Sequence, residues 1–184
     1  MSDSPLAAIA AELDAIAIPY MVVGSFASML HGEPRTTQDL DLVIDPTVEQ
    51  LDALLARLDP AKYYFDRDVA LDALSRRSMF NVIDIGTAWK IDLVIRKDRA
   101  FSIEELQRRR VVVMMGVRVA AATAEDTIVA KLEWAKQGAS TRQLVDVAGI
   151  LRVRRESLDL TYLQRWVEAL DLADEWARAR ALVT

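Results

Sequence analysis

The chain has 184 residues, of which 52% are apolar, so it is long and apolar enough to bury one sizeable core. Its formal net charge of -5 argues against a surface built throughout to attract nucleic acid, and the absence of cysteine excludes disulfides, thiol nucleophiles and cysteine-bound zinc. The N-terminus lacks the basic lead-in of a signal peptide, and no apolar run approaches the roughly 18 residues of a membrane helix. We therefore expect one compact cytoplasmic unit that does not enter a membrane.

The first third of the chain predicts helices that alternate with strands. Ser4-Pro5 is typical of a helix start, and apolar residues follow it at helical spacing. Asp45-Pro46 predicts a second cap-plus-proline start, here before an amphipathic run. The predicted elements are a helix from Ser4 up to Pro19, a strand over 20–23, a helix from near Ser25 to near Gly32, a strand over 39–44 and a helix from Asp45 to Leu58.

The middle of the chain predicts β-hairpins. Residues 63–78 predict a short strand and a short helix. Apolar runs then flank the turn residues Gly86-Thr87, and the same pattern recurs around Gly116. Strands are therefore expected on both sides of each turn.

After residue 122 the pattern becomes helical. Thr123 with Asp126 and Ser140 with Gln143 have the spacing of capping boxes, which predicts two helix starts. Gly138 closes the first of these helices, and the last 25 or so residues predict two more. We expect an α/β core over residues 1–122 and a helical segment over 123–184.

Acidic residues interrupt two of the predicted strands. Side chains alternate between the faces of a strand, so Asp39 and Asp41 project from the same side. Two carboxylates held this close repel each other unless a cation lies between them, and hard oxygen ligands favour Mg²⁺ or Mn²⁺. Asp92 interrupts another apolar strand and is the candidate third ligand. Asp84 is its competitor, although a role as a hairpin residue beside the turn is favoured for Asp84. The pattern predicts two metal ions that support an in-line phosphoryl displacement.

A Gly-Ser pair precedes the carboxylates. Gly24 allows a close approach of backbone to a phosphate, and the helix that begins near Ser25 offers free N–H groups at the favourable end of its dipole. The stretch from Val22 to Ile44 therefore predicts a phosphate-binding turn followed by metal ligands.

These motifs resemble a known superfamily. "VGSFASML", "TTQDLDLVI" and "KIDLVI" resemble the Gly-Ser, Asp-x-Asp and third-Asp pattern of the DNA polymerase β-type nucleotidyltransferases. "AEDTIVAKLEW" and "STRQLVDVAGIL" resemble the branch of small bacterial nucleotidyltransferases and, more distantly, the AbiEii-type toxins. The resemblance implies a nucleotidyltransferase fold with a short mixed sheet flanked by helices, plus a helical C-terminal segment.

The resemblance also implies roles for single residues. It makes Asp39, Asp41 and Asp92 the catalytic residues and metal ligands, with Asp92 as base on the acceptor hydroxyl. It makes Gly24 and Ser25 the residues that hold the nucleoside triphosphate. In the same way, Thr37 matches the Ser/Thr two residues before the metal pair in many members. Two further candidates for phosphate contact are Arg35 and Lys131.

Several features have alternative interpretations. The Asp-x-Asp motif also occurs in haloacid dehalogenase phosphatases, where an apolar strand precedes it, whereas "EPRTTQ" precedes it here. Lys131 lies beside an apolar helix face, where it either extends to solvent or contacts phosphate. Arg142 and Asp146 are four residues apart, which favours a surface ion pair over a substrate role. His31 is expected near a helix C-terminus without a catalytic role.

The basic clusters at 107–110 and 152–156 are typical of solvated helix ends, although RNA contact is an alternative.

The favoured function is metal-dependent transfer of a nucleoside monophosphate to a hydroxyl, the acceptor being RNA, a protein or a small molecule. The rival is a catalytically silent binding protein with a protein partner, such as one half of a toxin-antitoxin pair.

Overall fold

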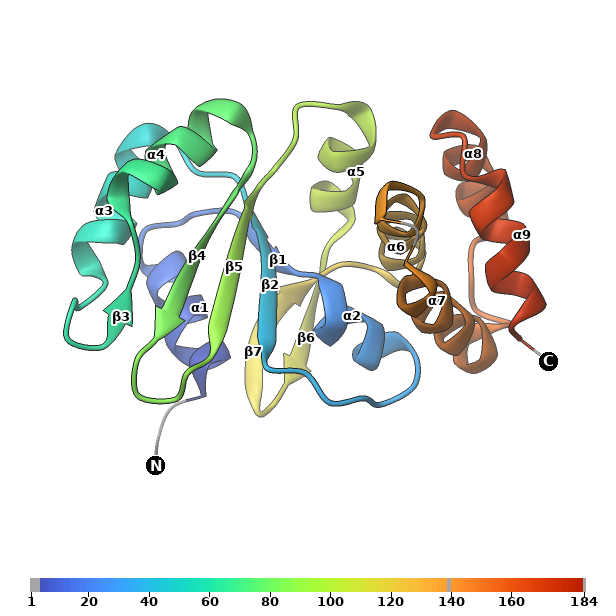
Figure 1. The fold of residues 1–184 in the computed structure, drawn as a ribbon, viewed down its shortest axis with the longest axis horizontal. Coiled ribbons are helices and arrows are strands. Elements are labelled where there is room, and N and C mark those ends of the chain that lie inside the picture. The colour runs from blue at the N-terminus through green and yellow to red at the C-terminus, as the bar shows by residue number, and fades with distance from the viewer. Residues whose placement is uncertain (1–3, 139, 184) are drawn as a thin grey trace. The chain divides into compact units, whose positions relative to one another are not determined.

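The computed structural model describes residues 4–138 and 140–183. These residues form a mixed α/β fold, which confirms the predicted class (Figure 1). The strands are β1 Tyr20–Val22, β2 Asp39–Ile44, β3 Tyr63–Tyr64, β4 Met79–Asp84, β5 Lys90–Ile95, β6 Arg110–Met114 and β7 Val117–Ala121. The helices are α1 Pro5–Ala15, α2 Gly24–His31, α3 Val48–Arg57, α4 Arg67–Arg76, α5 Ala100–Arg108, α6 Ala124–Gly138, α7 Thr141–Arg154, α8 Leu160–Ala169 and α9 Ala173–Ala181. None of the described helices is both long and apolar enough to cross a bilayer.

The chain divides into two compact units. Unit 1 comprises Met1–Val23 and Thr37–Ala121, and it contains every described strand together with α1, α3, α4 and α5. Unit 2 comprises Gly24–Thr36 and Ala122–Thr184, and it contains α2 and α6 to α9. Helix α2 thus belongs with the C-terminal helices although it follows strand β1 directly in the chain. The predicted division into 1–122 and 123–184 stays a prediction.

The sheet of unit 1 is mixed, with the strand order β3-β4-β5-β2-β1-β7-β6 (Figure 1). Strand β2 pairs parallel with β5 and antiparallel with β1, so the two strands that carry the predicted ligands are direct neighbours. Strands β4 and β5 form one predicted hairpin, and β6 and β7 form the other. Both hairpin predictions are confirmed.

Alternation along the strands explains which sheet face enters the core. Leu40, Leu42 and Ile44 on β2 are fully buried, as are Ile91 and Leu93 on β5. Helix α1 contacts α3 and β7, α3 contacts α4, and α4 contacts β4, so these helices form one layer on the sheet. The residues of β2 between the leucines project from the other face, where the acidic side chains lie.

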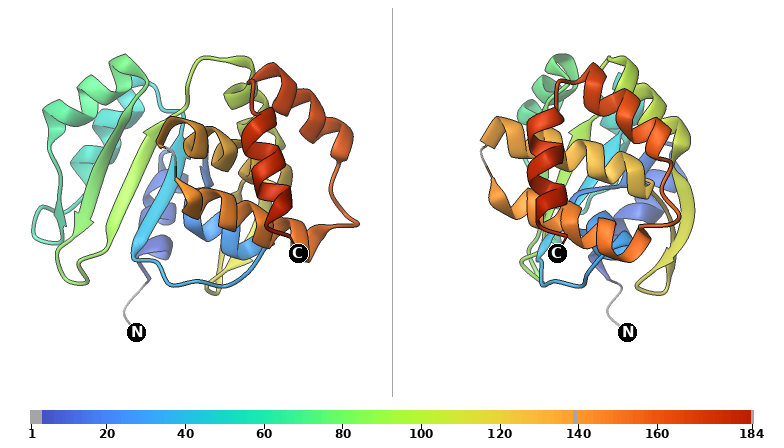
Figure 2. Two further views of the ribbon diagram at one scale, coloured as in Figure 1. Left: turned by 45° about the vertical axis from the view of Figure 1, so that its right-hand side comes forward. Right: turned by 90° about the vertical axis from the view of Figure 1, so that its right-hand side faces the viewer.

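Unit 2 is a helical assembly in which α6 and α7 form an antiparallel pair. Helix α2 contacts both of them, and α8 and α9 pack on the same pair (Figure 2). The contact of α2 with α7 is close at Gly32, where an added Cβ would lie 2.8 Å from the backbone nitrogen of Ile150. Only glycine permits this approach without displacing backbone.

The predicted cap at Asp45 is wrong, whereas the helix start predicted at Ser140 is confirmed without its capping bond. Asp45 does not cap α3, because Thr47 is its N-cap and forms a capping box with Gln50. Asp45 instead pairs with Arg96 and Arg77, at 2.8 and 3.3 Å, so its carboxylate is engaged within unit 1. At the start of α7, Ser140 occupies the N-cap position but makes no side-chain capping bond. Helix α5 has no counterpart among the predicted elements.

Candidate functional site

The predicted metal ligands lie on one face of the β2–β5 pair. The parallel register places Asp39 opposite Lys90 and Asp41 opposite Asp92. Directly paired residues project from the same face, with their strands about 4.8 Å apart. The structure therefore brings Asp39, Asp41 and Asp92 together on neighbouring strands, as the alternation predicts. We refer to these three aspartates as the carboxylate face.

Burial differs strongly within the carboxylate face. Asp39 is exposed, Asp41 is half-buried, and Asp92 is only 6% exposed. The Oδ1 atom of Asp92 is buried and accepts no hydrogen bond from any residue that the structure describes. A buried carboxylate oxygen without a donor is costly, so this atom calls for a cation.

Lys90 supplies the positive charge at this face. Its Nζ donates a hydrogen bond of 2.8 Å to Oδ2 of Asp92. The hydrogen bond to Asp92 raises the pKa of Lys90, and the charges of Asp92, Asp39 and Asp41 raise it further. Sequence reasoning missed Lys90, although its position two residues before Asp92 places both side chains on one face of β5.

The donor set fits a hard divalent cation. Carboxylate oxygens are the ligands that Mg²⁺ and Mn²⁺ prefer, and the orphaned Oδ1 of Asp92 is such an oxygen. Within residues 4–138 and 140–183, no three His, Asp or Glu side chains form a ready-made metal-binding group. The aspartates of the carboxylate face are thus adjacent by register but do not converge on one point.

Two further residues of unit 1 have clear local roles. The hydroxyl of Thr37 accepts a hydrogen bond of 3.3 Å from the backbone N–H of Asp39, which fixes the entry into β2. The Oδ1 atom of Asp84 accepts a hydrogen bond of 2.9 Å from the N–H of Thr87 in the β4–β5 turn. Asp84 is therefore a hairpin residue, the role that the sequence favoured for it.

The predicted phosphate-binding residues gather in unit 2. Gly24 has a φ of +60°, the left-handed region that favours glycine, and it begins α2 after the single residue Val23 that follows β1. Ser25 accepts a hydrogen bond from a terminal guanidinium nitrogen of Arg35. The hydroxyl of Ser28 donates to the Gly24 carbonyl at 2.9 Å. Arg35 is thereby held beside the first turn of α2.

A buried acid connects Arg35 with Lys131. The Nζ atom of Lys131 on α6 donates a hydrogen bond of 2.6 Å to Oδ2 of Asp146 on α7, and Oδ1 of Asp146 lies 3.4 Å from Nε of Arg35. The side chains of Lys131 and Asp146 are only 6% and 8% exposed. The predicted surface ion pair between Arg142 and Asp146 is therefore wrong, because Asp146 faces the helix interface.

Other singled-out residues serve the packing of unit 2. Nε2 of His31 lies 2.7 Å from the carbonyl of Ala122, and burial lowers the pKa of its imidazole. In the basic cluster at 152–156, Arg152 donates a bidentate pair of hydrogen bonds to the carboxylate of Glu33, and both distances are 2.7 Å. Arg154 donates to the last carbonyls of α2. These two arginines thus join α7 to the end of α2.

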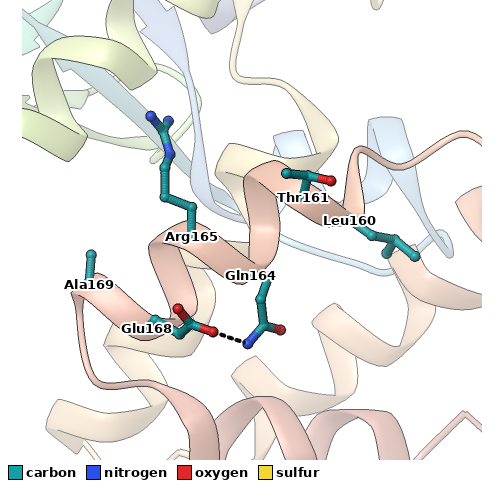
Figure 3. A pocket seen from close by; sticks show the side chains of 6 residues that line it. All are labelled: Leu160, Thr161, Gln164, Arg165, Glu168 and Ala169. Carbon is teal, nitrogen blue, oxygen red and sulfur yellow. Dashed lines mark hydrogen bonds between the residues drawn. The ribbon is translucent and has the colours of Figure 1, made fainter.

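An open depression of about 920 Å³ lies along α8, and none of the predicted site residues lines it (Figure 3). Figure 3 shows the Arg165 side chain directed away from the Gln164–Glu168 hydrogen bond. The guanidinium of Arg165 lies 5.1 Å from the ring centre of Tyr162 and 4.9 Å from that of Trp166. The residues that line the depression are Leu160, Thr161, Gln164, Arg165, Glu168 and Ala169, all on one helix. It is an exposed helix surface.

Comparison with known proteins identifies the fold. No protein-family model and no curated protein matches the sequence. The crystal structure of ANT(2'')-Ia in complex with adenylyl-2''-tobramycin is 17% identical and superposes with a TM-score of 0.57, covering 92% of this chain and 94% of that one. The lincomycin-bound structure of the lincosamide antibiotic adenylyltransferase LnuA is 11% identical and has a TM-score of 0.53. The match covers 82% of this chain and 96% of the LnuA chain.

A third similar structure is an antigenic nucleotidyltransferase-like protein from Paracoccidioides brasiliensis. It is 19% identical with a TM-score of 0.51, and the match covers 91% of this chain and 88% of that chain. These similarities show that the chain has the nucleotidyltransferase fold, as the sequence predicts. The predicted likeness to AbiEii-type toxins stays a prediction.

Proposed function

We propose that this chain is a metal-dependent nucleotidyltransferase. In the proposed reaction, the oxygen of an acceptor hydroxyl attacks the α-phosphorus of a nucleoside triphosphate. The bond between the α-phosphorus and the bridging oxygen to the β-phosphate breaks, and pyrophosphate leaves. The acceptor retains the nucleoside monophosphate, and the hydroxyl proton passes to a base of the protein.

The observation that carries this proposal is the carboxylate face. Acidic side chains on two adjacent strands repel one another, and burial of Asp92 makes that repulsion more expensive. A structural role alone leaves the orphaned Oδ1 atom of Asp92 unexplained. A bound cation satisfies this oxygen and offsets the charge of Asp39 and Asp41 at the same time.

Asp39, Asp41 and Asp92 are the residues that would hold the cation, which we propose to be Mg²⁺ or Mn²⁺. When bound, the cation supplies charge neutralisation for the attacking and leaving oxygens. Asp92 is the proposed base for the acceptor hydroxyl. Thr37 positions this set through its hydrogen bond to the backbone of Asp39.

The proposed triphosphate contacts come from the start of α2. The free N–H groups of its first turn, at Gly24 and Ser25, suit phosphate oxygens. Arg35 offers its guanidinium beside Ser25. Lys131 acts on this group through Asp146, since its ammonium is buried against that carboxylate.

The acceptor is proposed only as a hydroxyl of RNA, a protein or a small molecule. ANT(2'')-Ia was crystallised with an adenylylated antibiotic, and LnuA is a lincosamide adenylyltransferase, so an antibiotic-like polyol belongs in any panel of acceptors. The rival interpretation, a silent binding protein, uses the same fold without turnover.

Calorimetric titration tests the proposal. Each of the four ribonucleoside triphosphates is titrated with Mg²⁺ or Mn²⁺ into the wild-type protein and into Asp39→Asn/Asp41→Asn. We expect metal-dependent binding that the double variant loses. The matched control is Asp52→Asn/Asp72→Asn, which removes the same charge from exposed helix positions of unit 1 and leaves binding unchanged.

Unchanged binding in the Asp39→Asn/Asp41→Asn variant would contradict the proposed function. Binding in the wild type without pyrophosphate release, together with a stable heteromeric partner on purification, identifies the silent binding protein instead. Release of pyrophosphate with one acceptor of the panel names the substrate.

A further inference from the structure

Lys90 and Asp92 form an ion pair at the carboxylate face, and the two side chains differ in their exposure to solvent. The side chain of Lys90 is 41% exposed, whereas that of Asp92 is 9% exposed. The lysine thus extends from the solvent side over a carboxylate that is almost buried. Across the parallel ladder, Asp39 lies opposite Lys90 and Asp41 lies opposite Asp92.

We propose that the ammonium of Lys90 is the resident counter-ion of the carboxylate face and must leave Asp92 before a divalent cation binds there. The proposal rests on the proposed function, since it assigns the loading step of the same site. It makes Lys90 a residue that sets metal affinity.

The contacts of Asp92 support displacement of the Lys90 ammonium by a divalent cation. Its Oδ2 accepts the Lys90 hydrogen bond of 2.8 Å, so one of its two oxygens is already occupied. Oδ1 is buried and accepts no hydrogen bond from the described residues, so Lys90 satisfies only half of the carboxylate. A divalent cation that binds this carboxylate meets the ammonium charge at close range and gains from its departure.

The chemistry of lysine suits this role. An ammonium is a compact charge on a flexible side chain, so it can move away from Asp92 while the backbone of β5 stays in place. The exposed part of the Lys90 side chain gives it a path into solvent. The Lys131–Asp146 pair shows the contrast, because both of its side chains are buried and neither has such a path.

An ordinary surface ion pair does not account for these features. Such pairs join two exposed side chains and contribute little. Here one partner is buried, and the two residues opposite the pair across the parallel ladder, Asp39 and Asp41, are acidic as well. The ladder thus places three acidic residues on the face that carries Lys90, which favours a divalent cation there.

The test uses Mn²⁺ alone, without nucleotide. Free Mn²⁺ is measured by electron paramagnetic resonance during titration of the wild type, Lys90→Met and Lys97→Met. Lys97 is the matched control, because it is exposed just beyond the far end of β5. We expect Lys90→Met to bind Mn²⁺ about tenfold more tightly than the wild type, from loss of one nearby charge in partly solvated surroundings, with Lys97→Met unchanged.

A second measurement observes the displacement itself. The Lys90 ammonium signal is assigned by nuclear magnetic resonance through its loss in Lys90→Met. Added Mg²⁺ is expected to shift this signal toward that of Lys97, which stays constant. If Lys90→Met does not fold, Lys90→Gln replaces it, since glutamine keeps a donor for Asp92 without the charge.

The outcomes separate this proposal from the proposed function. Equal or weaker Mn²⁺ binding by Lys90→Met, or an ammonium signal that Mg²⁺ leaves in place, overturns the role of Lys90 only. Absence of Mn²⁺ binding in both proteins overturns the metal site as well. Tighter Mn²⁺ binding by Lys90→Met than by the wild type, together with loss of Mn²⁺ binding in Asp39→Asn/Asp41→Asn, supports both proposals.

Discussion

Removal of the buried acid of unit 2 is expected to be strongly destabilising. Asp146→Leu leaves the ammonium of Lys131 buried without its 2.6 Å partner. Breaking a buried pair from one side costs about 3–5 kcal/mol, because an uncompensated charge remains in low dielectric. Lys131→Met is expected to cost less, because Asp146 keeps Arg35, whose side chain is 21% exposed, as a partner at 3.4 Å.

The double variant Lys131→Met/Asp146→Leu decides whether the charges or the packing matter. Replacing both partners by apolar side chains of similar volume is often near neutral, so the double variant is expected to be more stable than Asp146→Leu alone. With a urea slope of about 2 kcal/mol/M, a loss of about 3 kcal/mol in Asp146→Leu lowers the unfolding midpoint by about 1.5 M.

Tryptophan fluorescence is a suitable probe for this cycle. Trp134, Trp166 and Trp176 all lie in unit 2, whereas Trp89 alone lies in unit 1. Urea titrations of the wild type, both single variants and the double variant give the coupling free energy directly. If the double variant loses as much as the two single variants added together, the account of a buried charge pair is refuted.

Two further predictions concern the packing of α2. Gly32→Ala is expected to lose about 1–3 kcal/mol in urea unfolding, because the new Cβ would meet the backbone of Ile150 at 2.8 Å, whereas Gly138→Ala, with nothing within 4 Å, should not lose stability. Burial holds the pKa of His31 below its ordinary 6.5, so the unfolded chain takes up the proton first as the pH falls. Stability is therefore expected to be full above about pH 6.5 and to decline below it, a slope that His31→Gln should reduce in thermal unfolding between pH 5 and 8. A wild-type melting temperature that stays level over this range would contradict the pKa argument.

Local periodicity predicts part of the carboxylate face. The two-residue repeat of a strand places Asp39 and Asp41 on one side, and the apolar run around Asp92 marks a second strand. The parallel register that pairs Asp41 with Asp92 comes from tertiary structure. The same repeat also relates Lys90 to Asp92, so this residue was within reach of sequence reasoning.

The partners of Asp146 could not be predicted from local periodicity. Helical spacing relates Asp146 to Arg142 on the same helix, and this led to the wrong ion pair. The true partners, Lys131 and Arg35, come from other segments, so their pairing depends on how α6 and α7 pack. Asp45 shows the same limit, because its cap motif is overridden by arginines that are distant in the sequence.

The proposed function depends on a divalent cation bound at the carboxylate face. Anomalous diffraction at the manganese edge tests it most directly, on crystals grown with Mn²⁺ and a non-hydrolysable triphosphate. If the carboxylate face holds the cation, an anomalous peak is expected roughly 2.1 Å from Oδ1 of Asp92 and from a carboxylate oxygen of Asp39 or Asp41. A fully occupied manganese peak elsewhere, with none at these oxygens, would contradict it.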